Sequence, residues 1–328
     1  MIPNFSYIRA RSVDEAIRYL SLDGTRAHAG GTDLLGCLRD RVFDATTVVS
    51  IAGLKELKGI GATTAGGLRI GSLTTIADVA RHPLIESKYR ALSMAAAEVA
   101  SPQLRHQGTI GGNLCQKPRC WYYRGEFHCL RKGGDQCYAV EGEDTYHCIF
   151  GGENCFIVHP SDTAAALVAL QASVVIAGPN GRRTVAVEKF HVPPSEDYTR
   201  ETVLEPAEIV TEIILPAAAA GLRSSYRKVR ARRAWDFALA GAALAIVFSG
   251  DQAIDCRVVL SGAAPVPWRA TEAEEVVRGS RLDPDRAAKA AAAAVKNAEP
   301  MEQNEYKIPL FRGLIEQQLT AIAQAGSR

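Results

Sequence analysis

The amino-acid sequence predicts a globular protein of two domains that contains both helices and strands. Its 328 residues are too many for one ordinary hydrophobic core and suit two domains. The shares of hydrophobic (47%) and charged (23%) residues are typical of soluble globular proteins. Segment 216–225 (PAAAAGLRSS) is small and flexible in character, which predicts a linker. We therefore place the two domains at residues 1–217 and 222–328.

Charge and hydropathy exclude several classes of protein. The net charge of +2 is too small to favour a nucleic-acid partner. The longest uncharged apolar stretch, 237–250, is shorter than the roughly 20 residues of a membrane-spanning helix. The N-terminus has no basic start followed by an apolar run, so we expect no secretory signal. We therefore expect a cytoplasmic protein, exported only if a partner subunit carries it. No Ser–His–Asp or paired-carboxylate pattern supports hydrolysis.

The first hundred residues alternate short helices and strands. A capping box begins at Ser12 and predicts a helix through about residue 22. Thr74 or Thr75 caps a second helix, which Pro83 ends. The alanine-rich residues 89–100 predict a third helix. We expect strands at 26–29, 46–51 and 68–71 and a helical or irregular segment at 34–39.

Residues 108–162 contain glycine, cysteine and aromatic residues without a lasting period, which predicts loops wrapped around a bound group. Regular structure is expected to resume after them. We expect helices at 163–172, 283–298 and 308–325 and strands at 173–177, 226–230 and 256–262.

Two glycine-rich segments share a pattern that suits an anion. They are AGGTDLL, residues 29–35, and TIGGNL, residues 109–114. Paired glycines permit positive φ and a close approach of the backbone, so that successive N–H groups form a concave anion site. Two such loops suit a pyrophosphate, although a Gly-Gly pair is also simply a tight turn. Neither segment matches the G-x-G-x-x-G pattern, so a Rossmann fold is poorly supported. The candidate binding residues are Ala29, Gly30, Gly31, Thr32, Asp33, Leu34, Thr109, Gly111, Gly112 and Asn113.

Five sequence blocks in order carry a family resemblance. They are AGGTDLL, TIGGNL, HPSD (159–162), KVRARRAWDFALAG (228–241) and SGAAPVPWRATEAE (261–274). Over essentially the whole chain they resemble the flavin-binding medium subunit of the molybdenum hydroxylases, the xanthine dehydrogenase and carbon monoxide dehydrogenase family. The resemblance implies an α+β fold. A vanillyl-alcohol-oxidase-type FAD-binding domain of two subdomains would precede a smaller α/β C-terminal domain like that of the carbon monoxide dehydrogenase flavoprotein.

The resemblance also implies which residues hold FAD. The two glycine segments would hold the pyrophosphate, Ser161 and Asp162 would contact the nucleotide part, and Lys228 would lie near the isoalloxazine. Lys228 belongs to the basic run 227–233, whose charges a strand would divide between two faces. His159 is expected to brace a turn.

Six of the eight cysteines fall in one short stretch, which indicates a shared role. The stretch contains no C-x2-C pair of the kind usual at zinc sites. Long irregular spacings suit an iron–sulfur cluster enclosed by a wrapped loop, while a zinc site and the absence of any ligand role stay open at this point. The six are Cys115, Cys120, Cys129, Cys137, Cys148 and Cys155.

A second resemblance concerns the insert at about 116–156, which ordinary flavin subunits lack. It resembles the insert that carries a [4Fe–4S] cluster in 4-hydroxybenzoyl-CoA reductase and the bacterial molybdenum aldehyde oxidoreductases. Cys115 and Cys148 are interpreted as packed residues, with Cys148 the alternative to one ligand. Because the glycine segments lie outside the insert, FAD is expected to survive substitution of any of the six cysteines. The resemblance implies Cys120, Cys129, Cys137 and Cys155 as cluster ligands, shielded by Trp121, Tyr122, Tyr123 and Phe127 and balanced in charge by Arg119, Arg124, Arg131 and Lys132.

We therefore expect an electron-transfer subunit that binds FAD and one [4Fe–4S] cluster, with no catalytic residue of its own. The implied partners are a molybdenum-cofactor large subunit, which performs the substrate chemistry, and a [2Fe–2S] small subunit, in a dimer of heterotrimers. One alternative is a free-standing FAD oxidoreductase with a structural zinc in the insert. Another is a zinc-binding interaction module without flavin. Substrate, external electron partner and direction of electron flow are not specified by this chain.

Overall fold

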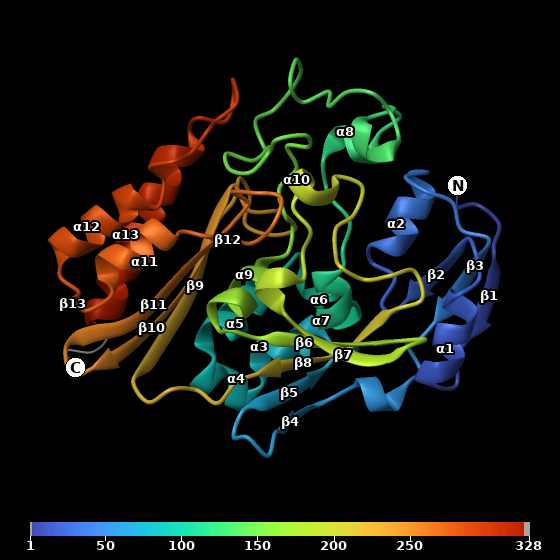
Figure 1. The fold of residues 1–328 in the computed structure, drawn as a ribbon, viewed down its shortest axis with the longest axis horizontal. Helices are drawn as coiled ribbons and strands as arrows, with labels where there is room; N and C mark the ends of the chain where they lie inside the picture. The colour runs from blue at the N-terminus through green and yellow to red at the C-terminus, as the bar shows by residue number, and fades with distance from the viewer. Residues whose placement is uncertain (1, 325–328) are drawn as a thin grey trace.

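The computed structural model describes residues 2–324, which form three sheets with helices around them. Figure 1 shows the first sheet and the last at opposite ends of the molecule, with the middle sheet and its helices between them. The residues of the cysteine-rich insert lie above these helices in that view. None of the helices described in residues 2–324 is long and apolar enough to cross a membrane.

The first sheet is parallel, with the strand order β1–β3–β2. Helix α1 packs against it through Ala16 and Leu20, which are buried. The predicted cap is present, because the Ser12 hydroxyl accepts from the Glu15 N–H at 3.1 Å. The elements are β1 (Ser6–Arg9), α1 (Val13–Leu20), β2 (Thr25–His28), α2 (Leu34–Arg39) and β3 (Thr47–Ser50).

The middle sheet is antiparallel, with the order β4–β5–β8–β6–β7. Helices α3, α5 and α9 share one apolar core with it. Pro83 does end α3, as expected, but it also begins α4 at the first helical position, where a missing N–H costs nothing. The strands are β4 (Ile60–Ala62), β5 (Leu68–Gly71), β6 (Ser173–Gly178), β7 (Gly181–Ala186) and β8 (Ile209–Leu215). The helices are α3 (Ile76–Arg81), α4 (Pro83–Lys88), α5 (Arg90–Glu98), α6 (Pro102–Gln107), α7 (Ile110–Leu114), α9 (Asp162–Ala169) and α10 (Pro194–Asp197).

The last sheet is antiparallel, with β9, β10, β11 and β12 side by side and β13 paired with β11. Successive residues of β10 enter different cores: Ala243 packs with α5 and α9, whereas Leu244 packs with α11–α13. The sheet is therefore buried on both faces. The elements are β9 (Leu222–Val229), β10 (Ala240–Ser249), β11 (Gln252–Ser261), β12 (Trp268–Arg269), α11 (Thr271–Val277), β13 (Ser280–Arg281), α12 (Pro284–Ala293) and α13 (Lys307–Gln324).

Several boundaries differ from the sequence-based expectation; the helix predicted at 283–298, for example, ends at Ala293. The linker predicted at 216–225 is wrong in its second half, because β9 begins at Leu222. Ser224 is already buried there, and its hydroxyl accepts from the Ala91 N–H at 3.1 Å. Residue 325, the predicted end of the last helix, lies outside the described residues.

The insert consists mostly of loops that the C-terminal residues hold in place. Its helical turns are short: α8 (Trp121–Arg124) and a 3-10 turn at Leu130–Lys132. The fully buried Lys307 of α13 donates to the carbonyls of His147 and Gly262, both at 2.8 Å. Burial lowers the pKa of Lys307 to about 8. Its ammonium thus fastens the insert to the last sheet.

Candidate functional site

One cavity of about 380 Å³ gathers the residues that the sequence predicts to hold FAD. Twelve of the thirteen line it, and Ser161 does not. They come from the first glycine segment, the second glycine segment, the start of α9 and strand β9, which lie far apart in the sequence. The volume falls in the range usual for small-molecule and cofactor sites.

The first glycine segment connects β2 to α2 and offers free backbone donors. Gly31 has a φ of 75°, as the Gly-Gly pattern predicts. Gly30 has no positive φ, and a Cβ there would overlap the carbonyl oxygen of Gln107, so this glycine lets the segment pack on the residues before the second one. Within residues 2–324, the N–H groups of residues 30–33 donate to no protein acceptor. Successive free N–H groups at a cavity wall suit an anion.

The second glycine segment is not the positive-φ turn that its pattern predicted. It forms the short helix α7, capped by Thr109, whose hydroxyl accepts from the Gly112 N–H at 3.2 Å. Gly111 packs on Ser72, and a Cβ there would lie 2.8 Å from the Ser72 Cβ. A Cβ at Gly112 would meet only the Thr109 hydroxyl, at 3.0 Å. Gly111 thus serves close packing, and Gly112 leaves space at the cavity wall.

Ser161 supports the cavity from behind. Its side chain is fully buried, caps α9, and donates to the Asn113 amide oxygen at 2.6 Å. The same oxygen accepts from Thr163 at 2.6 Å. Ser161 therefore holds the second glycine segment against α9, and the predicted nucleotide contact is not seen in the cavity lining.

Asp162 and Lys228 form a buried ion pair at the cavity wall. The Lys228 ammonium lies 2.7 Å from one Asp162 carboxylate oxygen, and the Tyr226 hydroxyl donates to the other at 2.6 Å. Both charged side chains are more than nine-tenths buried. The positive charge of Lys228 is therefore balanced by Asp162, while the side chain still lines the cavity.

Neighbouring basic and histidine residues lie outside the cavity. Arg227 points away from Lys228 and donates to Gln317, so the strand does divide the basic run between two faces. His159 packs against His191, with ring centroids 4.1 Å apart, and its backbone N–H donates to the Ala264 carbonyl. This arrangement agrees with a bracing role. Burial lowers the pKa of both rings, that of His191 to about 4.

The cavity also has walls that sequence reasoning did not assign to it. Trp235, Asp236 and Phe237 line it. Only their position in the KVRARRAWDFALAG block could have assigned them to this cavity from the sequence. Lys117 and Arg119, at the start of the insert, line it as well. The insert therefore contributes to the wall of the cavity that the two glycine segments line, although these segments lie outside it in the sequence.

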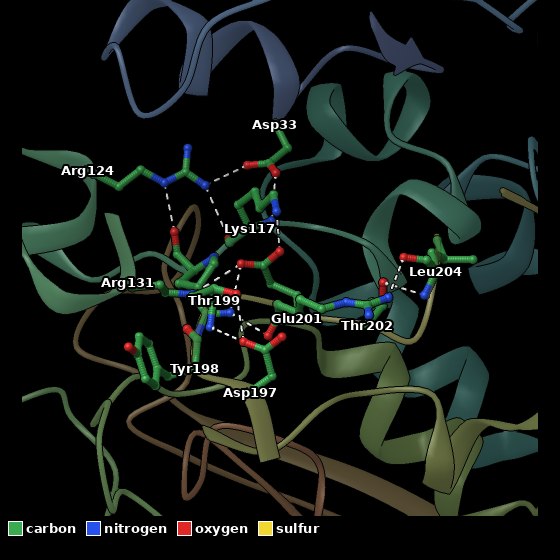
Figure 2. A network of polar contacts seen from close by, with 12 residues as sticks. Asp33, Lys117, Arg124, Arg131, Asp197, Tyr198, Thr199, Glu201, Thr202 and Leu204 are labelled. Atoms are coloured by element: carbon green, nitrogen blue, oxygen red, sulfur yellow. Dashed lines mark hydrogen bonds and ion pairs between the residues drawn. The ribbon is translucent and has the colours of Figure 1, made fainter. Parts of the chain in front are cut away.

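A charged network links the first glycine segment to the insert (Figure 2). The Asp33 carboxylate accepts from the Lys117 N–H at 2.8 Å and from the Arg124 guanidinium at 2.8 Å. The Lys117 ammonium and the buried Arg131 guanidinium both pair with Glu201. The network reaches the cysteine-rich loops through Arg131, whose backbone follows Cys129 by two residues.

The four predicted cluster ligands line one small cavity of about 10 Å³. Tyr122, Tyr123 and His147 are among the other residues that line it, and the His147 Nε2 lies 3.4 Å from the Cys120 sulfur. Cysteine thiolates are the usual ligands of an iron–sulfur cluster, so the residue types at this cavity suit one. Within residues 2–324 no group of three or more His, Cys, Asp or Glu is placed to hold a metal ion. The four cysteines are Cys120, Cys129, Cys137 and Cys155.

The residues around this small cavity match the predicted shield only in part. Tyr122 and Tyr123 are buried, whereas Trp121 and Phe127 are exposed. Of the basic residues, only Arg131 lines the cavity. Arg119 and Arg124 pair with Asp33 instead, and Lys132 donates to the Gly125 carbonyl.

The two remaining cysteines of the stretch lie elsewhere. Cys115 lines the large cavity, and burial raises the pKa of its thiol to about 12. Cys148 is buried beside Gly152, its N–H donates to the Phe156 carbonyl, and it does not line the small cavity. Both positions agree with the packed roles that their apolar neighbours predicted.

Known proteins resemble this chain along almost its entire length. Residues 3–218 match the family described as FAD binding domain in molybdopterin dehydrogenase, and residues 197–322 match the CO dehydrogenase flavoprotein C-terminal domain. The aldehyde oxidoreductase FAD-binding subunit PaoB of Escherichia coli (strain K12) is 34% identical over 94% of this chain and 95% of its own. The carbon monoxide dehydrogenase medium chain of Hydrogenophaga pseudoflava is 29% identical over 97% of both chains.

The fold agrees with these sequence matches. A carbon monoxide dehydrogenase structure from Hydrogenophaga pseudoflava superposes with a TM-score of 0.79 and 28% identity, covering 99% of both chains. Quinoline 2-oxidoreductase from Pseudomonas putida 86, at 23% identity and a TM-score of 0.79, shares the fold. An FAD-binding domain followed by a C-terminal flavoprotein domain thus accounts for the three sheets. The chain belongs to the FAD-binding medium subunits of the molybdenum hydroxylase family.

Proposed function

We propose that this chain binds FAD and a [4Fe–4S] cluster, and that these two cofactors exchange electrons with the redox centres of partner subunits. Family membership makes it an FAD-binding oxidoreductase subunit with its substrate chemistry on a partner. The proposal adds the residues that hold FAD, the cluster, and the assembly. When bound, the flavin would supply the redox chemistry, and the protein supplies orientation, burial and tuning.

The observation that carries the flavin assignment is the convergence of distant segments on the cavity of about 380 Å³. Free N–H groups at residues 30–33 would hold the pyrophosphate, and Gly112 lines the same cavity without a side chain. Asp162 and Lys228 would meet the flavin or ribityl part as a neutral pair. No protein acceptor competes for the free donors within the described chain.

The cluster assignment rests on four cysteines that line one small cavity. Cys115 and Cys148 lie outside that cavity, which supports the choice of four from six. A cubane needs four thiolates, so Cys120, Cys129, Cys137 and Cys155 satisfy it without a further residue. The nearby Arg131 guanidinium would offset part of the negative charge.

The partners are proposed from the same relatives. Carbon monoxide dehydrogenase and glyceraldehyde dehydrogenase relatives are named medium chains, which implies larger and smaller companions in those enzymes. We propose a molybdenum-cofactor large subunit and a [2Fe–2S] small subunit here, in a dimer of heterotrimers located in the cytoplasm.

The test is anaerobic purification of the full chain with its co-expressed partners. Extracted flavin, iron and acid-labile sulfide are quantified per chain, and the assembly mass is measured by native mass spectrometry. We expect one FAD and about four iron and four sulfide on this chain beyond the partners' content. Zinc in place of iron would overturn the cluster, and a chain without flavin would overturn the site. A fully active monomer would overturn the assembly.

A further inference from the structure

Arg119 stands between the two candidate cofactor sites. It directly precedes Cys120 in the sequence, yet its side chain lines the large cavity and not the small one. Its guanidinium lies 2.9 Å from the Asp33 carboxylate and 5.1 Å from the centre of the Phe237 ring. Asp33 is itself part of the first glycine segment. Arg119 is therefore fixed beside the free backbone donors of residues 30–33.

Arg119 has donor capacity that the protein does not use. One terminal nitrogen donates to the Gln116 amide oxygen at 3.0 Å and also pairs with Asp33. Its Nε is buried and has no hydrogen-bond partner among the described residues. A buried guanidinium donor without an acceptor is costly, so such a group indicates a missing ligand.

Arg124 provides a comparison within the same pair of arginines. It binds the same Asp33 carboxylate at 2.8 Å, but its Nε donates to the Pro118 carbonyl, the nitrogen bound to Asp33 also donates to the Lys117 carbonyl, and the side chain does not line the cavity. Burial lowers the pKa of Arg119. At Arg124 burial also acts to lower the pKa, but the charge and hydrogen bond of Asp33, together with Cys37 and Tyr123, raise it. Asp33 needs one cation for neutrality. Arg124 balances the negative charge of Asp33, so the positive charge of Arg119 remains without a counter-charge of its own.

We propose that Arg119 binds the diphosphate of FAD, together with the N–H groups of residues 30–33. This inference rests on the proposed flavin site and adds to it a ligand from the insert. A diphosphate supplies the acceptor that the Arg119 Nε lacks and the negative charge that balances its guanidinium. Asp33, Gln116 and Phe237 orient the side chain for that contact.

A consequence is that the insert takes part in flavin binding. Residue 119 can hold the diphosphate only while the chain on either side of it, Gln116 and the loop beginning at Cys120, keeps its place. Flavin affinity is thereby linked to the condition of the cysteine-rich loops, in contrast to flavin subunits without such an insert.

The test compares ligands that differ in their phosphates. Flavin is removed from the full-length protein, and the dissociation constants of FAD and riboflavin are measured by flavin fluorescence for the wild type, Arg119→Gln and Arg119→Lys. We expect Arg119→Gln to weaken FAD roughly ten- to a hundredfold, the effect of losing a charge-assisted hydrogen bond. Riboflavin, which has no phosphate, should keep its affinity. Arg119→Lys should recover part of the loss, and the exposed Arg39→Gln should change neither constant.

The other possible results distinguish a failure of the Arg119 proposal from a failure of the proposed flavin site. Unchanged FAD affinity in Arg119→Gln overturns the role of Arg119 and leaves the proposed flavin site intact. An equal loss of FAD and riboflavin affinity shows a structural effect and also overturns it. A wild-type protein that binds neither flavin overturns the proposed function itself.

Discussion

Gly31 and Gly112 are both glycine for different physical reasons. Gly31 needs a positive φ, and any Cβ there would lie 2.6 Å from the His28 Nε2. Gly112 has an ordinary helical backbone, and its missing side chain leaves space beside the Thr109 hydroxyl. A side chain at position 31 should therefore affect both the fold and the flavin site, whereas a side chain at position 112 should affect the flavin site alone.

Valine substitution should show this separation. Gly112→Val is expected to remove flavin while the thermal unfolding midpoint stays within a few degrees of the wild type, because the added atoms enter the cavity. Gly31→Val should lose flavin and also about 1–3 kcal/mol of stability, since a β-branched residue is strained at positive φ. Flavin content per chain and calorimetry check both. Full flavin in Gly112→Val would mean that this wall does not face the cofactor.

The His159 and His191 pair should make stability depend on pH. Burial lowers the pKa of His191 to about 4, below the value of about 6.5 in the unfolded chain, so only the unfolded state takes up its proton between those values. Stability must then fall as the pH drops from 7 towards 4. His191 alone contributes a loss of about 2 kcal/mol between pH 7 and pH 5.

Denaturant unfolding at pH 7 and pH 5 measures this loss. His191→Gln should be less stable at pH 7 yet lose less on acidification, since no proton uptake remains at that position. His106→Gln, at an exposed position, serves as the control and should keep the wild-type pH dependence. Equal pH dependence in His191→Gln and the wild type would contradict the assignment.

At the scale of elements, the sequence predicts where helices begin, through their capping residues, but it does not predict which strands pair. The helices at Ser12, Thr75 and Asp283 begin where their capping side chains predict, because capping is local. Strands β7, β8 and β10 were missed, as were the short strands β4, β12 and β13. β8 pairs with β5, which lies more than a hundred residues earlier, and β10 is an unbroken apolar run without alternation because both of its faces are buried.

The residues of the candidate site also fall into two groups, those that the sequence predicts and those that it does not. Its glycine segments and cysteines have strong local patterns. Arg119 and Phe237 enter the cavity only through tertiary packing, and nothing in their immediate sequence indicates that they meet. The conformation of TIGGNL was mistaken because a capped helix start and a glycine turn use the same residues.

The cysteine-rich loops give the sharpest prediction for an element. Alanine at Cys120, Cys129, Cys137 or Cys155 should abolish the cluster, because three thiolates leave one iron exposed to solvent. Cys148→Ala and Cys115→Ala should keep it and cost about 1 kcal/mol of packing. Iron and sulfide per chain are measured after anaerobic purification. Loss of the cluster in Cys148→Ala with retention in Cys155→Ala would reverse the ligand choice.

At the scale of the whole molecule, the C-terminal helix holds the insert through Lys307. Lys307→Met would leave the Gly262 carbonyl without a donor and the His147 carbonyl with the Asn304 amide alone, so we expect a loss of about 2–3 kcal/mol in unfolding free energy. Hydrogen exchange at residues 144–148 should accelerate more than exchange in the middle sheet. Lys296→Met, at an exposed position, is the matched control. Uniform acceleration across the protein would argue against a specific fastening.

The cavity that residues 26 to 237 enclose has a consequence for biosynthesis. A ribosome releases the glycine segments early, but the Trp235–Phe237 wall emerges much later, and β10 and β11 must follow before the sheet behind it is complete. The nascent chain therefore cannot fold around its flavin as it emerges. We therefore expect the flavin to enter after the Trp235–Phe237 wall has formed, so that the apoprotein folds before it binds the cofactor.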